Sequence, residues 1–193
     1  GHPLSCILEW AIANLNNTKA ENVITFSSHT APILAILRKN LFNNKNTQIA
    51  YTGELPASFD AEVIKTVYGY NFELLKVEKA EDISSFDGSL VFLSQEEKIS
   101  PIHLNPNIDF YINAYSHHGS VLLVNGQKNE SYVSEIQHVR RRETISMTPI
   151  NCLVALKALI DNSSFKIAKS NVEADKSSVL KSLKEITGTT AKP

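Results

Sequence analysis

The strongest candidate for chemistry is a run of four polar residues, Ser27-Ser28-His29-Thr30. It directly follows the apolar run Val23–Phe26, whose β-branched and aromatic residues favour a buried strand, and Pro32 then marks the first turn of a helix. Hydroxyl groups and free backbone N–H groups at a helix start can bind a phosphate or carboxylate, and a histidine there can act as acid or base. The simpler interpretation is a capping Ser or Thr beside an exposed imidazole.

Three further polar residues follow other expected strands. Glu54 lies just beyond an expected strand at 48–51, and Ser94 and Gln95 come directly after one at 89–93. Ligands of an open α/β sheet bind beyond the carboxyl ends of its strands, so we expect these residues at the same edge as the 27–30 run. The predicted cofactor-binding set therefore consists of Ser27, Ser28, His29, Thr30, Glu54, Ser94 and Gln95. For Glu54 the competing interpretation is a solvated charge that favours the start of the next helix.

One dense basic run, Arg140-Arg141-Arg142, could contact the phosphates of RNA or DNA, or an acidic partner. The commoner outcome for such a run is a solvated face, and no aromatic platform is interleaved with it. A metal site is not predicted. His117 and His118 are adjacent, so they do not face one direction on a helix, and no carboxylate cluster supplies further ligands.

Short apolar segments alternate with amphipathic ones along the chain. Strands are expected at 23–26, 48–51, 72–77, 89–93, 120–124, 144–148 and 165–168. Helices are expected at 4–15, 31–41, 57–68, 108–115, 130–139, 151–160 and 175–186. This alternation predicts a three-layer, Rossmann-like α/β fold with a mainly parallel sheet of about seven strands flanked by helices. We expect one domain over residues 1–187 and a flexible tail at 188–193.

Composition limits the classes of protein that need to be considered. Hydrophobic residues make up 42% of the chain and charged residues 20%, which is typical of a globular protein. The net charge of −1 provides no overall attraction to nucleic acid or to a membrane. Cys6 and Cys152 lie far apart among apolar residues, so we expect two reduced core thiols. Without a membrane-length apolar run or a secretion signal, the expected location is cytoplasmic.

The order and spacing of these elements, over roughly residues 4–170, resemble the class I S-adenosylmethionine-dependent methyltransferase fold. The likeness rests on three features: the strand, loop and helix over 23–37, the acidic Glu54, and the segments FDGSLVFLS (86–94) and HGSVLLVN (118–125) with Tyr111 between them. The last of these is similar to the small-molecule O-methyltransferase pattern. The resemblance implies S-adenosylmethionine as a cofactor, with Glu54 on its ribose. This chain departs from the family in having no glycine in its first loop.

The glycine-free loop leads to the hypothesis of a methyltransferase-like domain without catalysis, which acts as a binding or scaffolding module for a protein partner or a second copy. The first alternative is an active O-methyltransferase with an atypical loop, which positions a substrate oxygen for in-line attack on the methyl group. The second alternative is a nucleotide- or sugar-phosphate-binding protein that uses Ser28 and Thr30. No catalytic residue is assigned.

Overall fold

The computed structural model describes residues 2–165 together with Ser177, Lys181 and Glu185. Its centre is a six-stranded sheet in the order β1-β6-β5-β4-β2-β3. The strands are β1 (Val23–Phe26), β2 (Thr47–Tyr51), β3 (Glu73–Lys76), β4 (Ser89–Glu96), β5 (Phe110–Tyr115) and β6 (Gly119–Val124). β6 runs antiparallel to its neighbours β1 and β5, and the other neighbouring pairs are parallel. The sheet is therefore mostly parallel.

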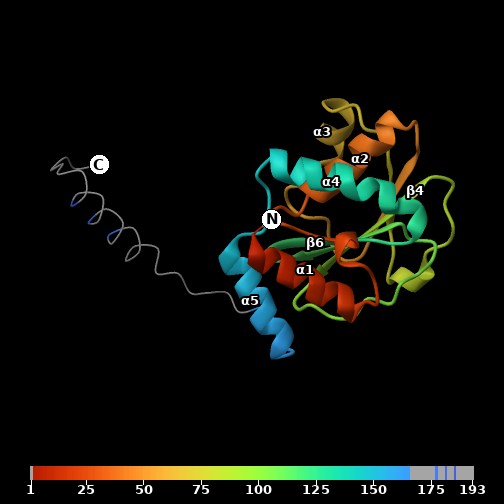
Figure 1. The fold of residues 1–193 in the computed structure, drawn as a ribbon. Helices are drawn as coiled ribbons and strands as arrows, with labels where there is room; N and C mark the ends of the chain where they lie inside the picture. The colour runs from red at the N-terminus through yellow and green to blue at the C-terminus, as the bar shows by residue number, and fades with distance from the viewer. Residues whose placement is uncertain (1, 166–176, 178–180, 182–184, 186–193) are drawn as a thin grey trace.

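Helices cover both faces of the sheet (Figure 1). On one face lie α2 (Ala31–Phe42), α3 (Ala61–Thr66) and α4 (Glu130–Arg142), and on the other lie α1 (Pro3–Leu15) and α5 (Pro149–Ile160). Short 3-10 turns occur at η1 (Ala20–Asn22), η2 (Ala80–Asp82) and η3 (Gln127–Asn129). Each face has its own buried apolar cluster, because the side chains of a strand alternate between the two faces. No helix in the described part of the chain is long and apolar enough to cross a membrane.

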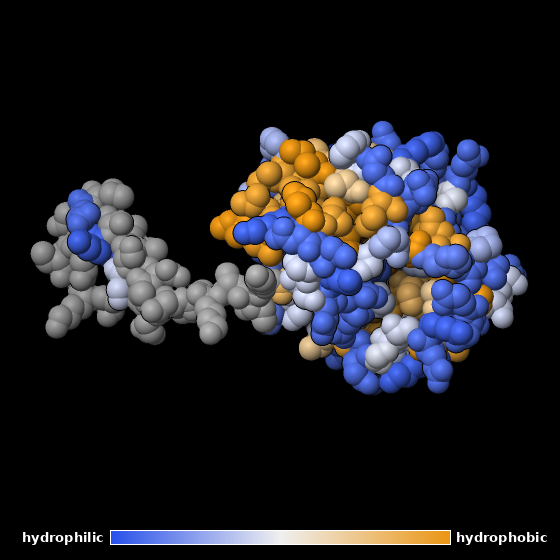
Figure 2. All heavy atoms as spheres, turned by 90° about the horizontal axis from the view of Figure 1, so that it is seen from below, coloured by the Kyte–Doolittle hydropathy of each residue, from blue (hydrophilic) through white to orange (hydrophobic). Residues whose placement is uncertain are grey.

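The outer surfaces of α1 and α5 carry exposed apolar side chains. These helices pack against each other, and Figure 2 shows hydrophobic residues gathered on this side of the molecule. The large exposed members are Ile7, Trp10, Ile150, Leu153 and Ile160. We refer to these five residues as the α1–α5 surface.

The prediction of a helix at 108–115 is wrong, because β5 occupies this segment. Ile108, Tyr111 and Tyr115 recur at helical spacing, but every residue of β5 except Asn113 is buried. A strand buried on both faces gives a nearly continuous apolar run, which periodicity cannot distinguish from a buried helix.

The sheet has six strands in the described residues and not about seven, and the difference arises near the C-terminus. The expected strand at 144–148 is reduced to a single bridge between Ser146 and Phe26. Phe165 is not in a strand. Residues 166–168, the tail at 188–193, and most of the expected helix at 175–186 lie outside the described residues.

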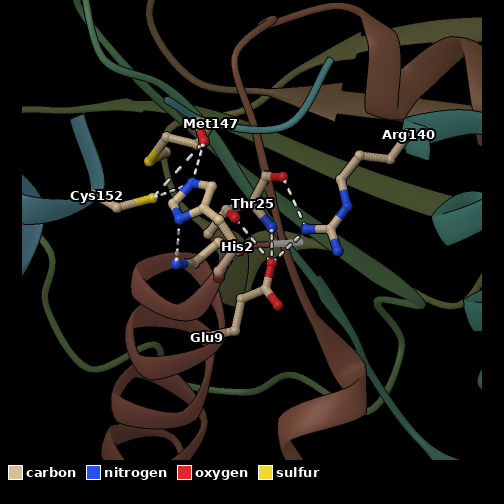
Figure 3. Close-up of polar contacts among 7 residues, drawn as sticks. His2, Glu9, Thr25, Arg140, Met147 and Cys152 are labelled. Carbon is tan, nitrogen blue, oxygen red and sulfur yellow. Dashed lines mark hydrogen bonds and ion pairs between the residues drawn. The ribbon is translucent and has the colours of Figure 1, made fainter. Parts of the chain in front are cut away.

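β1 lies at one edge of the sheet, and side chains from two helices cover its open side (Figure 3). Glu9 of α1 accepts hydrogen bonds through Oε1 from the backbone N–H of Thr25, at 2.9 Å, and from its hydroxyl, at 2.8 Å. Arg140 of α4 donates to the carbonyl oxygen of Thr25, at 3.2 Å, and forms an ion pair with Glu9. Both charged residues are buried. The pair thus links the two helical layers and satisfies edge backbone groups that could otherwise pair with another strand.

Each of these charges is buried with its partner, so the effects of removing them should not be independent. We expect Arg140→Met to lower the free energy of unfolding by about 3–5 kcal/mol, since it leaves the Glu9 carboxylate buried without its cation. The Glu9→Met/Arg140→Met double variant should lose less than the sum of the two single variants. Urea denaturation measures all three, with the exposed neighbour Arg141→Met as the control. Strictly additive losses would contradict this account of the pair.

Candidate ligand site at the carboxyl edge of the sheet

The Ser27–Thr30 loop joins β1 to α2 at the carboxyl edge of the parallel strands. Ser28 Oγ accepts hydrogen bonds from the backbone N–H groups of Thr30, at 3.3 Å, and Ala31, at 3.1 Å. Ser120 at the start of β6 donates its hydroxyl to the carbonyl oxygen of Ser28, at 2.7 Å. The loop is therefore held by a hydrogen bond from β6 and by the bonds that its own Ser28 side chain accepts. Ser28, His29 and Thr30 remain partly exposed.

His29 reaches from this loop to the end of β5, where its Nε2 lies 3.0 Å from the carbonyl oxygen of Tyr115. A carbonyl oxygen can only accept a hydrogen bond, so Nε2 carries the proton. In the neutral ring Nδ1 is then left as an acceptor. The sequence suggested an acid or base at this position, and this geometry fixes which nitrogen can serve as the base.

The turn between β5 and β6 lies beside His29 and consists of Ser116, His117 and His118. His117 takes a left-handed conformation, with φ of 63°. The His118 ring stacks on Phe165, with centroids 4.9 Å apart. The two histidines therefore belong to a hairpin turn and not to a helix.

The other predicted residues lie along β2 and β4 at the same edge. Gln95 donates from Nε2 to the carbonyl oxygen of Glu54, at 2.7 Å, and the Glu54 carboxylate lies 3.2 Å from the Lys76 ammonium. The Glu54 side chain is 86% exposed. Ser94 is buried and donates to Asn113 Oδ1, at 3.2 Å. Glu54 and Gln95 therefore form one group, Ser27–Thr30 another, and no side-chain hydrogen bond within the described residues joins the two.

Two cavities open near the ends of β4 and β5. One, of about 170 Å³, is lined by Ser94, Asn113, Lys98 and His103 among others. The second, of about 260 Å³, lies between Glu96 and Phe165. Lys98, His103 and Asn113 were not singled out in the sequence, because Asn113 sat in a misassigned helix and the other two in a segment without periodicity.

The three arginines do not form a surface patch together. Arg140 is buried in its pair with Glu9, whereas Arg141 and Arg142 are exposed. Arg142 is itself paired with the neighbouring Glu143, at 2.9 Å. The predicted contact with nucleic acid or an acidic partner therefore stays a prediction for Arg141 and Arg142 alone.

The two cysteines differ in environment. Cys152 is buried, and its Sγ lies 3.9 Å from Nε2 of His2, which is 2.9 Å from the carbonyl oxygen of Met147 (Figure 3). Burial, reinforced by the nearby Glu9 charge, raises the pKa of the Cys152 thiol to about 11. Cys6 is exposed, so the expectation of two core thiols holds for Cys152 only. The described residues contain no group of three side chains that could hold a metal.

No protein-family model and no curated protein matches the sequence. Solved structures do share its fold. A cystathionine gamma synthase from Xanthomonas oryzae pv. oryzae, in complex with aminoacrylate and cysteine, matches with a TM-score of 0.53 and 12% identity, over 82% of this chain and 51% of that one. A protein described as an L-allo-threonine aldolase from Listeria monocytogenes EGD-E gives 0.52 and 12%, over 84% and 58%. A protein described as a sugar aminotransferase from Streptococcus pneumoniae, in its PMP form, gives 0.53 and 13%, over 82% and 59%.

These structures correct the family recognised from the sequence. The chain has the fold of aminotransferases, an aldolase and a cystathionine synthase, so the resemblance to methyltransferases is wrong. The methyltransferase-like binding or scaffolding module, the active O-methyltransferase and S-adenosylmethionine are discarded with it, and the nucleotide or sugar-phosphate alternative gains no support. The misassigned β5 explains the error, because a helix in its place gave the element order of a methyltransferase. The chain spans little more than half the length of these matched structures.

The close approach of β6 to the end of β1 gives a direct test of how the Ser27–Thr30 loop is held. Gly119 has φ of 97°, and a Cβ there would lie 2.0 Å from the carbonyl oxygen of Phe26. We expect Gly119→Ala to lower the free energy of unfolding by more than about 3 kcal/mol, because backbone must move. Gly126→Ala is the matched control, since φ is 77° there but nothing lies within 4 Å, and should cost about 1–2 kcal/mol. Equal losses in urea denaturation would refute the steric explanation.

Thiol labelling should separate the two cysteines. At pH 8 we expect one thiol per folded chain, Cys6, to react rapidly with a disulfide reagent, and Cys152 to react only on unfolding. The raised pKa of Cys152 keeps its thiol protonated, so from the ordinary thiol value of 9.0 up to about 11 ionisation favours the unfolded state. Stability should therefore fall as the pH rises through this window, and Cys152→Ala should reduce that fall. Two rapidly reacting thiols in the folded chain would overturn the assignment.

Proposed function

We propose that this chain is part of a longer enzyme that uses pyridoxal phosphate on an amino acid, and that the Ser27–Thr30 loop binds the phosphate of the cofactor. Transamination, aldol cleavage and cystathionine synthesis, the activities named for the matched structures, are reactions in which this cofactor acts as an electron sink. A shared fold does not fix a function, so the support has to come from the residues at the site.

The main support for phosphate binding is the arrangement of hydrogen-bond donors at the start of α2. Two hydroxyl groups, of Ser28 and Thr30, and the N–H groups of Thr30 and Ala31 converge where the twelve-residue helix begins. The N–H group of Thr30 reaches Ser28 Oγ at 3.3 Å, which is long for such a bond, and that of Ala31 at 3.1 Å, near the upper end of the usual range. A phosphate oxygen would form shorter, charge-assisted bonds with them and would also interact favourably with the helix dipole.

The described residues do not fit the covalent attachment that this cofactor normally has. Pyridoxal phosphate is held by a lysine, with an acidic or arginine partner for its ring nitrogen. Neither the Ser27–Thr30 loop nor the 116–118 turn contains a lysine. Lys76 is paired with Glu54, and Lys98 lies at the cavity of Ser94 and Asn113. We therefore derive no covalent step, and the proposal is confined to phosphate binding.

His29 is the residue of this chain best placed to act on a molecule bound there. Its ring is fixed by the carbonyl oxygen of Tyr115, one residue away from the phosphate donors. With Nε2 committed to that bond, Nδ1 can accept a hydrogen bond or a proton from the ligand. Its role is to orient the ligand or to take up a proton from it.

Thermal unfolding tests the proposal with three probes: pyridoxal phosphate, pyridoxal and inorganic phosphate. Ligand that binds only the native state raises the midpoint, by an amount equivalent to about 2.7 kcal/mol at 100 times Kd. We expect a rise with pyridoxal phosphate and none with pyridoxal, because the phosphate carries the binding. Thr30→Val should reduce the rise, and Thr66→Val, on the exposed end of α3, should leave it unchanged. Thr30 is used because its side chain does not cap the helix.

Two results would count against the proposal. One is the lack of any rise at millimolar pyridoxal phosphate. The other is an equal rise with pyridoxal, which would place the binding on the ring and not on the phosphate. Reduction with borohydride followed by mass spectrometry gives an independent check, since the described residues predict no stable attachment to a lysine within residues 2–165.

A further inference from the structure

A larger cavity lies at the junction of α2 with the end of α4. Its volume is about 380 Å³, within the range typical of small-molecule pockets. One face of α2 contributes Leu34, Ala35 and Arg38, and the end of α4 and the segment after it contribute Val139, Arg142 and Ile145. Leu34, Ala35, Val139 and Ile145 provide an apolar floor. Ala31 also lines this cavity, which therefore adjoins the Ser27–Thr30 loop, but Ser28 and Thr30 do not line it.

A flat aromatic wall closes one side of the cavity. Tyr68 and Tyr70 line it, and their rings are stacked with centroids 6.0 Å apart and planes 8° apart. Burial raises the pKa of the Tyr70 phenol, and the positive charge of Arg38 opposes this effect. A planar apolar molecule can pack against such a wall with little loss of its own conformational entropy.

The charge at the rim is positive. Arg38 and Arg142 both line the cavity, and the only carboxylate among its lining residues is that of Glu143. The Glu143 carboxylate is paired with the guanidinium of Arg142, whose Nε lies at 3.0 Å and whose terminal nitrogen lies at 2.9 Å. Arg38 makes no ion pair with any residue that the structure describes, and its guanidinium lies over the Phe42 ring at 5.7 Å. One guanidinium is therefore available to a single negative charge.

From this combination we infer that the cavity between α2 and α4 binds a planar aromatic monocarboxylate, with its ring between Tyr70 and the apolar floor and its carboxylate on Arg38. A guanidinium binds a carboxylate in a two-bonded, charge-assisted geometry. The apolar floor and stacked tyrosines select an aromatic body, and the single available cation selects one negative charge. The inference does not rest on the phosphate-binding loop, because neither Ser28 nor Thr30 lines this cavity.

Calorimetric titration with 2-naphthoate and its neutral analogue 2-naphthalenemethanol tests the assignment. We expect naphthoate to bind about tenfold more tightly or better, since one charge-assisted hydrogen bond is worth at least this factor. Arg38→Gln should remove the preference. Arg141→Gln, which changes an exposed arginine outside the cavity, should retain it. Pyridoxal phosphate should not displace naphthoate, which keeps this result distinct from that for the Ser27–Thr30 loop.

Amide chemical shifts locate the bound molecule. Saturable changes at Leu34, Val139 and Ile145 are the expected result. Changes confined to Ile7, Trp10 and Leu153 would mean that naphthoate binds the α1–α5 surface, and this would overturn the inference. Equal affinity for the acid and the alcohol, or no binding at millimolar concentration, would overturn it as well.

Discussion

The position of the candidate site depends on the way the open edge of β1 is covered. Thr25 has backbone groups that no neighbouring strand can satisfy, and Glu9 and Arg140 supply the missing partners. Each charge is buried because the other is present, so α1 and α4 cannot move independently without exposing or isolating one of them. Two residues further along β1 the Ser27–Thr30 loop begins. The pair therefore holds an edge strand in place and, with it, the start of α2.

A second constraint acts from the other side of β1. Gly119, at the start of β6, has no side chain and can lie against the carbonyl oxygen of Phe26. The next residue, Ser120, then donates its hydroxyl to the carbonyl oxygen of Ser28. His29 adds a bond to the end of β5. The loop is thus fixed by the hairpin of β5 and β6, through contacts that span 86 and 92 residues of sequence, and a rigid binding site requires such support.

Much of the sheet could be predicted from the sequence, because local patterns are sufficient for amphipathic helices and short apolar strands. The gathering of Ser28, Glu54 and Gln95 at one edge followed from the rule for parallel strands, although their roles remain predictions. β5 was missed because burial on both faces removes the alternation that identifies a strand. The burial of Arg140 could not be predicted either, since its partner Glu9 lies 131 residues away in a run that looks only helical.

The methyltransferase family inferred from the sequence was wrong, and the reason is physical. Hydroxyl and N–H groups at the start of a helix can bind an anion on many folds, so the residues at 27–30 do not identify a family. The matched solved structures show that the fold is shared with a cystathionine gamma synthase and with a protein described as a sugar aminotransferase. We propose that the start of α2 binds the phosphate of pyridoxal phosphate, and amide chemical shifts of the chain titrated with that cofactor test this most directly. Saturable changes at Thr30 and Ala31 that pyridoxal does not produce are predicted, and unchanged shifts at these two amides would contradict the claim.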